Sequence, residues 1–157
     1  RGVSHAERLA DLGLALPPVP APAAAYVPAV RHGDLVIVSG QLPLRDGTLL
    51  ATGLVGSDVT QDDAAELAGV CALNALAAAA SVAGGLDAIA AVLRVGVFVA
   101  SAAGFTAQHL VANGASQLLS DVLGPWAVHA RAAVGVARLP LDAPVEVEAM
   151  LTVVPGA

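Results

Sequence analysis

Apolar and polar positions alternate with a period of two near the C-terminal end of the chain. Between residues 130 and 137, and again between 145 and 149, apolar side chains occupy every second position. Such alternation is typical of β-strands. The run Leu139-Pro140-Leu141-Asp142-Ala143-Pro144 between them is rich in turn-forming residues. Residues 129–151 therefore predict two strands joined by a tight connection, antiparallel about a turn centred near residues 141 and 142.

Further strands are predicted upstream. Residues 26–30 form a candidate first strand, residues 31–34 a turn, and the apolar, β-branched run 35–39 a buried strand. Asp46-Gly47 is a hairpin signal. Residues 91–100 predict a strand with two distinct faces. The expected faces are Val92, Arg94, Gly96 and Phe98 on one side, and Leu93, Val95, Val97 and Val99 on the other.

Three helices complete the pattern. Ser4, with Glu7 in capping-box position, predicts a short helix to Leu12. Thr60 caps a long alanine-rich helix that Gly84-Gly85 ends. Thr106 is the expected cap of a third helix reaching Leu123. Its apolar stripe is Val111, Ala115, Leu118 and Val122.

The order of these elements predicts a single α+β domain over residues 1–157, with helices on one face of a sheet. Residues 1–25 form an N-terminal helix and an extended arm with Pro17, Pro18, Pro20 and Pro22, and residues 26–157 form the core. The other sheet face is then apolar and uncovered. We expect a partner to cover it.

Composition argues against several classes of function. The chain has no lysine, seven arginines and a net charge of −6, which disfavours binding to nucleic acid. Residues 67–86 are apolar enough to span a membrane, but acids flank them and no basic residue does, which favours a buried helix. The four histidines show no metal-ligand spacing, so no metal site is expected. Cys71 is the only cysteine and no secretory signal is visible, so we expect a cytoplasmic protein.

Two motifs carry a resemblance. The stretch HARAAVGVARLPLDAPVEVEA resembles the C-terminal signature of the RidA/YjgF family of reactive-intermediate deaminases, and Val38-Ser39-Gly40-Gln41-Leu42-Pro43 resembles its second motif. The likeness covers roughly Tyr26 to the end. It implies a chorismate-mutase-like fold with a mixed sheet, assembled as a homotrimer with sheets facing inward and ligand sites between subunits. It implies no cofactor.

The resemblance also assigns roles to residues. Arg131 would grip a substrate carboxylate, and Glu146 would orient or activate water. Tyr26, Ser39, Gly40, Asn113 and Ala133 would line the pocket, although the sequence around Tyr26 differs from the family pattern. Ala133 stands where many members carry a cysteine, so any activity would use water rather than a thiol. For Glu148 an ion pair or a solvated carboxylate is expected, and for His129 a place at the rim.

Three functions remain open from the sequence. The first is hydrolysis of 2-imino acids or enamines, such as 2-aminoacrylate, to 2-keto acids and ammonia. The second is a non-catalytic trimeric module that binds small carboxylates, and the third is an endoribonuclease that inhibits translation.

The predicted connection between the last two strands has a geometric consequence. It places Glu146 level with about Ala137, six residues from Arg131, or roughly 20 Å along the sheet. One small ligand cannot reach both groups across that gap. We therefore predict that the two residues of one site come from different subunits.

Overall fold

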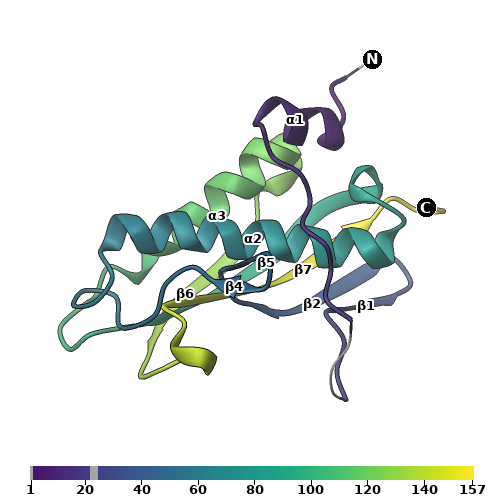
Figure 1. The fold of residues 1–157 in the computed structure, drawn as a ribbon. Helices are drawn as coiled ribbons and strands as arrows, with labels where there is room; N and C mark the ends of the chain where they lie inside the picture. The colour runs from purple at the N-terminus through teal and green to yellow at the C-terminus, as the bar shows by residue number, and fades with distance from the viewer. Residues whose placement is uncertain (1, 22–24) are drawn as a thin grey trace.

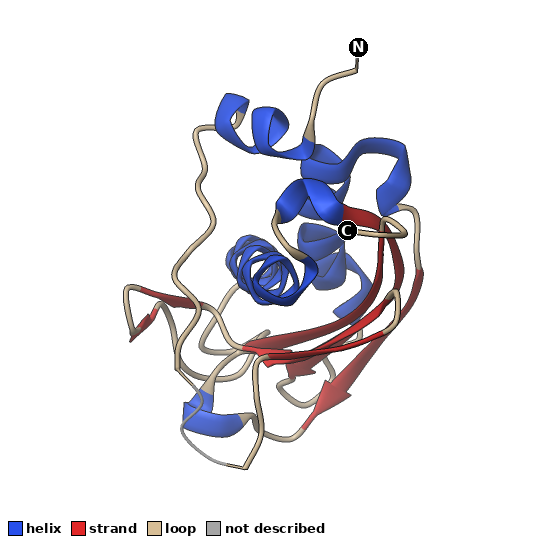
Figure 2. Cartoon of the chain, turned by 90° about the vertical axis from the view of Figure 1, so that its right-hand side faces the viewer, coloured by secondary structure: helices blue, strands red, loops and turns tan. Residues whose placement is uncertain are grey.

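Two long helices lie on one face of a five-stranded sheet (Figures 1 and 2). The structure is a computed structural model that describes residues 2–21 and 25–157. Its helices are α1 (His5–Asp11), α2 (Gln61–Ala83) and α3 (Gln108–Leu123), with short 3₁₀ turns at Leu86–Ala88, Gly124–Ala127 and Pro140–Asp142. Its strands are β1 (Ala29–His32), β2 (Leu35–Gln41), β3 (Leu44–Arg45), β4 (Thr48–Leu49), β5 (Ile89–Ala100), β6 (Ala130–Val136) and β7 (Val145–Val153). The predicted α+β class is confirmed.

The main sheet has the strand order β1-β2-β7-β5-β6, and β3 pairs with β4 as a separate hairpin. Neighbouring strands are antiparallel except β5 and β6, which are parallel because α3 connects them. The sheet is therefore mixed, as expected. Strand β6 lies at one edge, and α3 lies above it on the helix side.

Local sequence signals fix most of the elements. Ser4 and Glu7 form the predicted capping box of α1, and Thr60 caps α2 by accepting from Asp63 N–H. Asp46 and Gly47 both take the positive φ that a two-residue hairpin turn requires. For α3 the predicted end at Leu123 is confirmed, but the predicted cap Thr106 is wrong, because the helix begins at Gln108 and its N-cap position is Ala107, which makes no side-chain cap bond. Its buried stripe includes Leu119, while Leu118 is only partly buried.

The strand predictions need three corrections. Strand β1 begins at Ala29, so Arg31 belongs to a strand rather than to a turn. Strand β2 buries alternate positions only, and Ile37 is 47% exposed on the uncovered face. In β5 a bulge between Val92 and Arg94 breaks the alternation, so Val92 is buried together with Val95 on the helix side.

The two last strands are not neighbours, because β5 lies between them. Phe98 pairs with Glu146 of β7 and with Val134 of β6. Glu146 is therefore level with Val134 rather than Ala137, and the predicted separation of six residues from Arg131 is wrong. The cause lies in the connection, where Leu141 and Asp142 adopt left-handed φ values and shift the turn centre toward Pro140.

Helices α2 and α3 cross at very short range. An added Cβ on Gly114 would collide with the backbone of Ala65, and Gly69 lies against the Gly114 carbonyl. Alanines fill most of the buried face of α2. This helix is long and apolar enough to cross a membrane, but 56% of its most apolar window is buried inside the domain, as in the core helix of a soluble fold. The close crossing fixes the height of α3 above the edge strand β6.

Neither α2 nor α3 covers the opposite face of the sheet (Figure 2). Val30 is 54% exposed, Ile37 47% and Val134 45%, and all three point away from the helices. Arg94 and Glu148 lie among them, 3.6 Å apart. We call this surface the open sheet face.

Candidate functional site

Arg131 lies on the edge strand β6 and turns its side chain toward α3. Its Nη1 donates to Asn113 Oδ1 at 2.9 Å and to Ser116 Oγ at 3.0 Å, and its Nη2 donates to the His109 carbonyl at 3.2 Å. A guanidinium has five N–H donors, so two remain for another partner. We call Arg131, Asn113, Ser116 and His129 the arginine cluster. Asn113 thus takes a positioning role that the sequence did not specify.

No carboxylate neutralises Arg131 within residues 2–21 and 25–157. The described ion pairs of the chain's arginines involve Arg31, Arg94 and Arg138. Arg131 is exposed, and it borders a shallow pocket of about 290 Å³ with Ser116, Ser120 and His129. An oriented, unpaired guanidinium beside a pocket is suited to a ligand carboxylate.

Ala133 follows Arg131 on the same side of β6 and packs partly against the core. It brings no reactive group to the pocket. The one thiol of the chain, Cys71, is fully buried in α2 and donates to the Val145 carbonyl at 3.7 Å. Burial raises the pKa of the Cys71 thiol well above its ordinary value, and the charge of Glu146 acts in the same direction. Thiol chemistry at this site therefore has no candidate.

Glu146 lies on the open sheet face. Its carboxylate rests over the backbone of Gly40, where any Cβ would collide with Oε1. Burial raises the pKa of the Glu146 carboxyl from its ordinary value of 4.5, and the nearby charge of Glu148 raises it further. It makes no ion pair with the described part of the chain. Glu146 therefore keeps its proton to a higher pH than an ordinary glutamate does.

Ser39 directly precedes Gly40 in β2 and is bonded to the segment that follows Tyr26. The Ser39 hydroxyl donates to the Val27 carbonyl at 2.7 Å, and Ser39 N–H donates to the Pro28 carbonyl at 2.9 Å. These bonds hold the segment after Tyr26 against β2. The Tyr26 side chain itself is 69% exposed. We call Glu146, Gly40 and Ser39 the glutamate cluster; no contact joins Tyr26 to it among the described residues.

One chain does not bring the two clusters together. Arg131 pairs with Val95, whose side chain is buried under the helices, whereas Glu146 pairs with Phe98 on the open sheet face. Side chains of paired residues share a face. The two groups are three residues apart in level, or roughly 10 Å, and point to opposite faces of the sheet.

Glu148 and His129 were expected to have minor roles. Glu148 pairs with Arg94, which confirms an ion pair. His129 is bonded within the arginine cluster, to Ser116 Oγ through Nε2 at 3.0 Å and to the Ala127 carbonyl through Nδ1. Sequence reasoning did not identify Ser116. The available signal is its spacing of three residues from Asn113, which puts both on one helix face.

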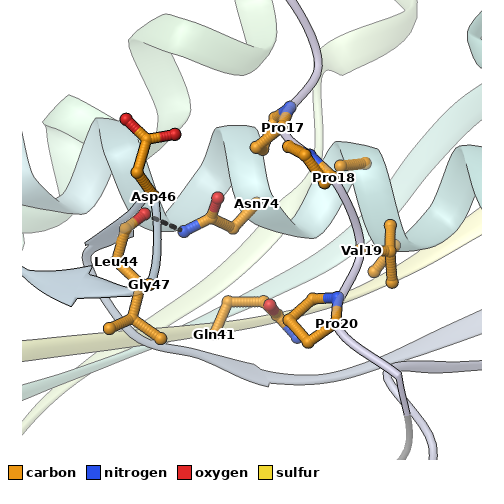
Figure 3. Close-up of a pocket in the computed structure, with 11 residues that line it drawn as sticks. Pro17, Pro18, Val19, Pro20, Gln41, Leu44, Asp46, Gly47 and Asn74 are labelled. Carbon is orange, nitrogen blue, oxygen red and sulfur yellow. Dashed lines mark hydrogen bonds between the residues drawn. The ribbon is translucent and has the colours of Figure 1, made fainter.

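A second pocket lies under the N-terminal arm (Figure 3). It has a volume of about 320 Å³ and is bounded by Pro17–Pro20, the β3–β4 hairpin and α2. Asn74 donates to the carbonyls of Leu42 and Leu44 and so fastens the hairpin to α2. The arm therefore lies across its own domain, although Pro22 falls outside the described residues. None of the residues assigned by resemblance lines this pocket.

Metal binding has no support in the described residues, where no group of three or more His, Cys, Asp or Glu side chains converges.

The fold places the chain among small α+β domains with two helices on one face of a mixed sheet. A family model for endoribonuclease L-PSP proteins matches residues 18–153. Protein TCP17 of Trypanosoma cruzi is 43% identical over 147 residues, which are 93% of this chain and 92% of that protein. The chain belongs to the endoribonuclease L-PSP family, which is the YjgF/RidA family.

Two solved structures illustrate the range of the family. The protein Atu1372 of Agrobacterium tumefaciens, of unknown function, is 46% identical with a TM-score of 0.88, covering 96% of this chain and 92% of that chain. TdcF of E. coli with bound serine is 26% identical with a TM-score of 0.59, covering 85% of this chain and 92% of that chain. The RidA/YjgF resemblance is thus confirmed at the level of family and fold.

Proposed function

We propose that the protein hydrolyses 2-imino acids and their enamine tautomers to 2-keto acids and ammonia. The observation that carries the proposal is Arg131, held by three hydrogen bonds and facing a pocket without a described acidic partner. The two remaining N–H donors would bind the substrate carboxylate. TdcF, a relative, was solved with serine, which also carries a carboxylate.

Glu146 would supply the proton transfers. In its ionised form the carboxylate takes a proton from water as the water oxygen bonds to the imine carbon. The resulting carboxylic acid then returns this proton to the nitrogen, which gives a carbinolamine. In a second round Glu146 takes the hydroxyl proton and passes it to the amino nitrogen, so that the carbon–nitrogen bond breaks, ammonia leaves and the keto group forms. A raised pKa favours the second transfer, because the ideal general acid–base group titrates near the working pH.

This chemistry needs two subunits. Since Arg131 and Glu146 point to opposite faces of one sheet, a single chain cannot place both on one small substrate. The open sheet face, with its exposed apolar side chains, would be covered by other copies in a homotrimer. A cyclic, head-to-tail contact would then set the arginine cluster of one subunit beside the glutamate cluster of the next.

The second candidate is a non-catalytic module that binds small carboxylates. Ala133 favours it, since the pocket lacks a nucleophilic thiol. An endoribonuclease is the third candidate and has the support of the family's description. The net charge of −6 without any lysine disfavours RNA binding. A cytoplasmic location, where amino-acid metabolism generates imines, fits the first candidate.

The test couples the purified protein to an amino-acid oxidase that generates imino acids, and follows their decay. We expect faster hydrolysis than in the enzyme-free blank, no acceleration by Arg131→Ala, and full activity in Arg138→Ala. Arg138 is a suitable control because it is an exposed arginine that pairs with Asp142 at 2.9 Å. Binding of 2-keto acids without acceleration would instead establish the second candidate, and RNA cleavage that depends on Arg131 the third.

A further inference from the structure

Ser116 and His129 form a hydrogen-bonded pair that the proposed deaminase chemistry does not use. Ser116 Oγ lies 3.0 Å from His129 Nε2, and the other ring nitrogen, Nδ1, is bonded to the Ala127 carbonyl. A carbonyl oxygen only accepts hydrogen bonds, so Nδ1 carries the proton. In the neutral ring Nε2 is then the acceptor, and the Ser116 hydroxyl donates to it.

Arg131 completes a directed chain of hydrogen bonds. Its Nη1 donates to Ser116 Oγ at 3.0 Å, so this oxygen accepts from a cation while it donates to an imidazole. A positive group beside the oxygen stabilises the alkoxide that forms when the hydroxyl gives up its proton. A serine, a histidine base and a carbonyl that orients the base are the parts of an activated nucleophile.

The pair faces open space. Ser116, His129 and Arg131 all line the pocket of about 290 Å³, together with Ser120 and Val128. Ser120 lies one helical turn after Ser116 and does not take part in the hydrogen bonds to His129 and Arg131. The chain therefore offers two serines in one pocket, of which one is joined to a base.

The geometry points to Ser116 as a nucleophile with His129 as its general base, in a pocket that hydrolyses small carboxylic esters. Ser116 Oγ bonds to the ester carbonyl carbon as its proton passes to His129 Nε2, and Arg131 stabilises the oxyanion. The carbon–oxygen bond to the alcohol then breaks, and the alcohol leaves with the proton from His129. Water attacks the acyl-serine by the same route, which releases the carboxylic acid and restores Ser116.

This activity shares Arg131 with the proposed deamination, but it needs neither Glu146 nor a second subunit. A negative result in the imine assay would not count against ester hydrolysis. A negative result in the ester assay would not count against the role of Arg131 toward imino acids.

The test is covalent labelling of the full-length protein with phenylmethylsulfonyl fluoride, followed by peptide mass spectrometry. A general base typically accelerates such a step by 10²–10⁴-fold, so we expect Ser116 to be labelled at least about a hundredfold faster than Ser120. His129→Gln should remove this advantage while Ser120→Ala keeps it. A burst of p-nitrophenol from p-nitrophenyl acetate should follow the same pattern.

Equal labelling of Ser116 and Ser120 in the unaltered protein would overturn the proposal, and this comparison needs no variant to fold. Labelling of Ser116 that persists in a folded His129→Gln protein would also overturn it, because the serine would then react without its base. In either case the pair would serve only to tie α3 to β6.

Discussion

The arginine cluster and the glutamate cluster differ in how far one chain completes them. Three hydrogen bonds from α3 hold Arg131 in place, so its geometry is fixed before any ligand arrives. Glu146 rests on the backbone of Gly40, and its pKa is raised by burial and, further, by the nearby charge of Glu148. Arg131 is therefore a preorganised cation, and Glu146 is a carboxyl without a described ion-pair partner. The two lie on opposite faces of the sheet, so neither face of one chain carries both groups. Under the proposed function, assembly rather than folding alone would complete the catalytic arrangement.

The largest expected effect comes from Arg131→Ala. Hydrogen bonds to charged groups are each worth roughly 1.5–3 kcal/mol, so losing a bidentate pair should weaken 2-keto acid binding on the order of a hundredfold or more. Calorimetry with pyruvate measures the loss, and Arg138→Ala serves as the control. Unchanged affinity would show that Arg131 does not bind the ligand. The arginine cluster would then not be a preorganised binding site, and its contrast with the glutamate cluster would be wrong.

Gly40→Ala tests the other side of the comparison. Its added methyl group would collide with the Glu146 carboxylate, which must then move. Because displacing a catalytic group by about 1 Å can cost on the order of a hundredfold, kcat should fall strongly and KM much less. Gly69→Ala is the matched control, since its Cβ would lie at an ordinary 3.5 Å from the Gly114 carbonyl oxygen. Equal losses in both variants would point to general destabilisation.

The smallest expected effect is that of Glu146→Gln on the free energy of unfolding. The folded-state pKa of Glu146 is raised, so the folded protein binds more protons than the unfolded chain and its stability falls as pH rises above about 4.5. Glutamine removes this loss. Denaturant unfolding should therefore show a variant that is more stable than the parent near neutral pH, with the gain vanishing below pH 4.5. A variant that is less stable at neutral pH would mean that the carboxylate has a stabilising partner.

Much of the fold was predictable because local signals agree with it. The capping residues Ser4 and Thr60, the Asp46-Gly47 turn and the glycines after Ala83 mark ends that the structure reproduces. The motifs around Arg131 and Ser39 identified the family. Features formed by residues that are close together in the chain, such as helix caps and tight turns, can thus be predicted from the sequence.

Long-range pairing was not predictable in the same way. The insertion of β5 between β6 and β7, the bulge at Val92 and the left-handed turn at Leu141 together determine where Glu146 lies, and none has a strong local signal. The link from Ser116 to His129 and Arg131 likewise depends on the height of α3 over β6, which the crossing at Gly114 determines. The predicted distance along the sheet was therefore wrong. The prediction of a site shared between subunits now rests on a different observation, that Arg131 and Glu146 point to opposite faces of the sheet.

Mixed assemblies test that shared site most directly. Arg131→Ala and Glu146→Gln chains, each inactive alone, are unfolded, combined in equal amounts and refolded, and their mixing is verified by mass spectrometry of the intact oligomer. If each site takes its arginine from one subunit and its glutamate from the next, random mixing leaves about one quarter of the sites intact. The account predicts recovery of about that fraction of parental imine hydrolysis. No recovery in verified mixed oligomers would show that the two residues do not meet across subunits, which would contradict the shared site.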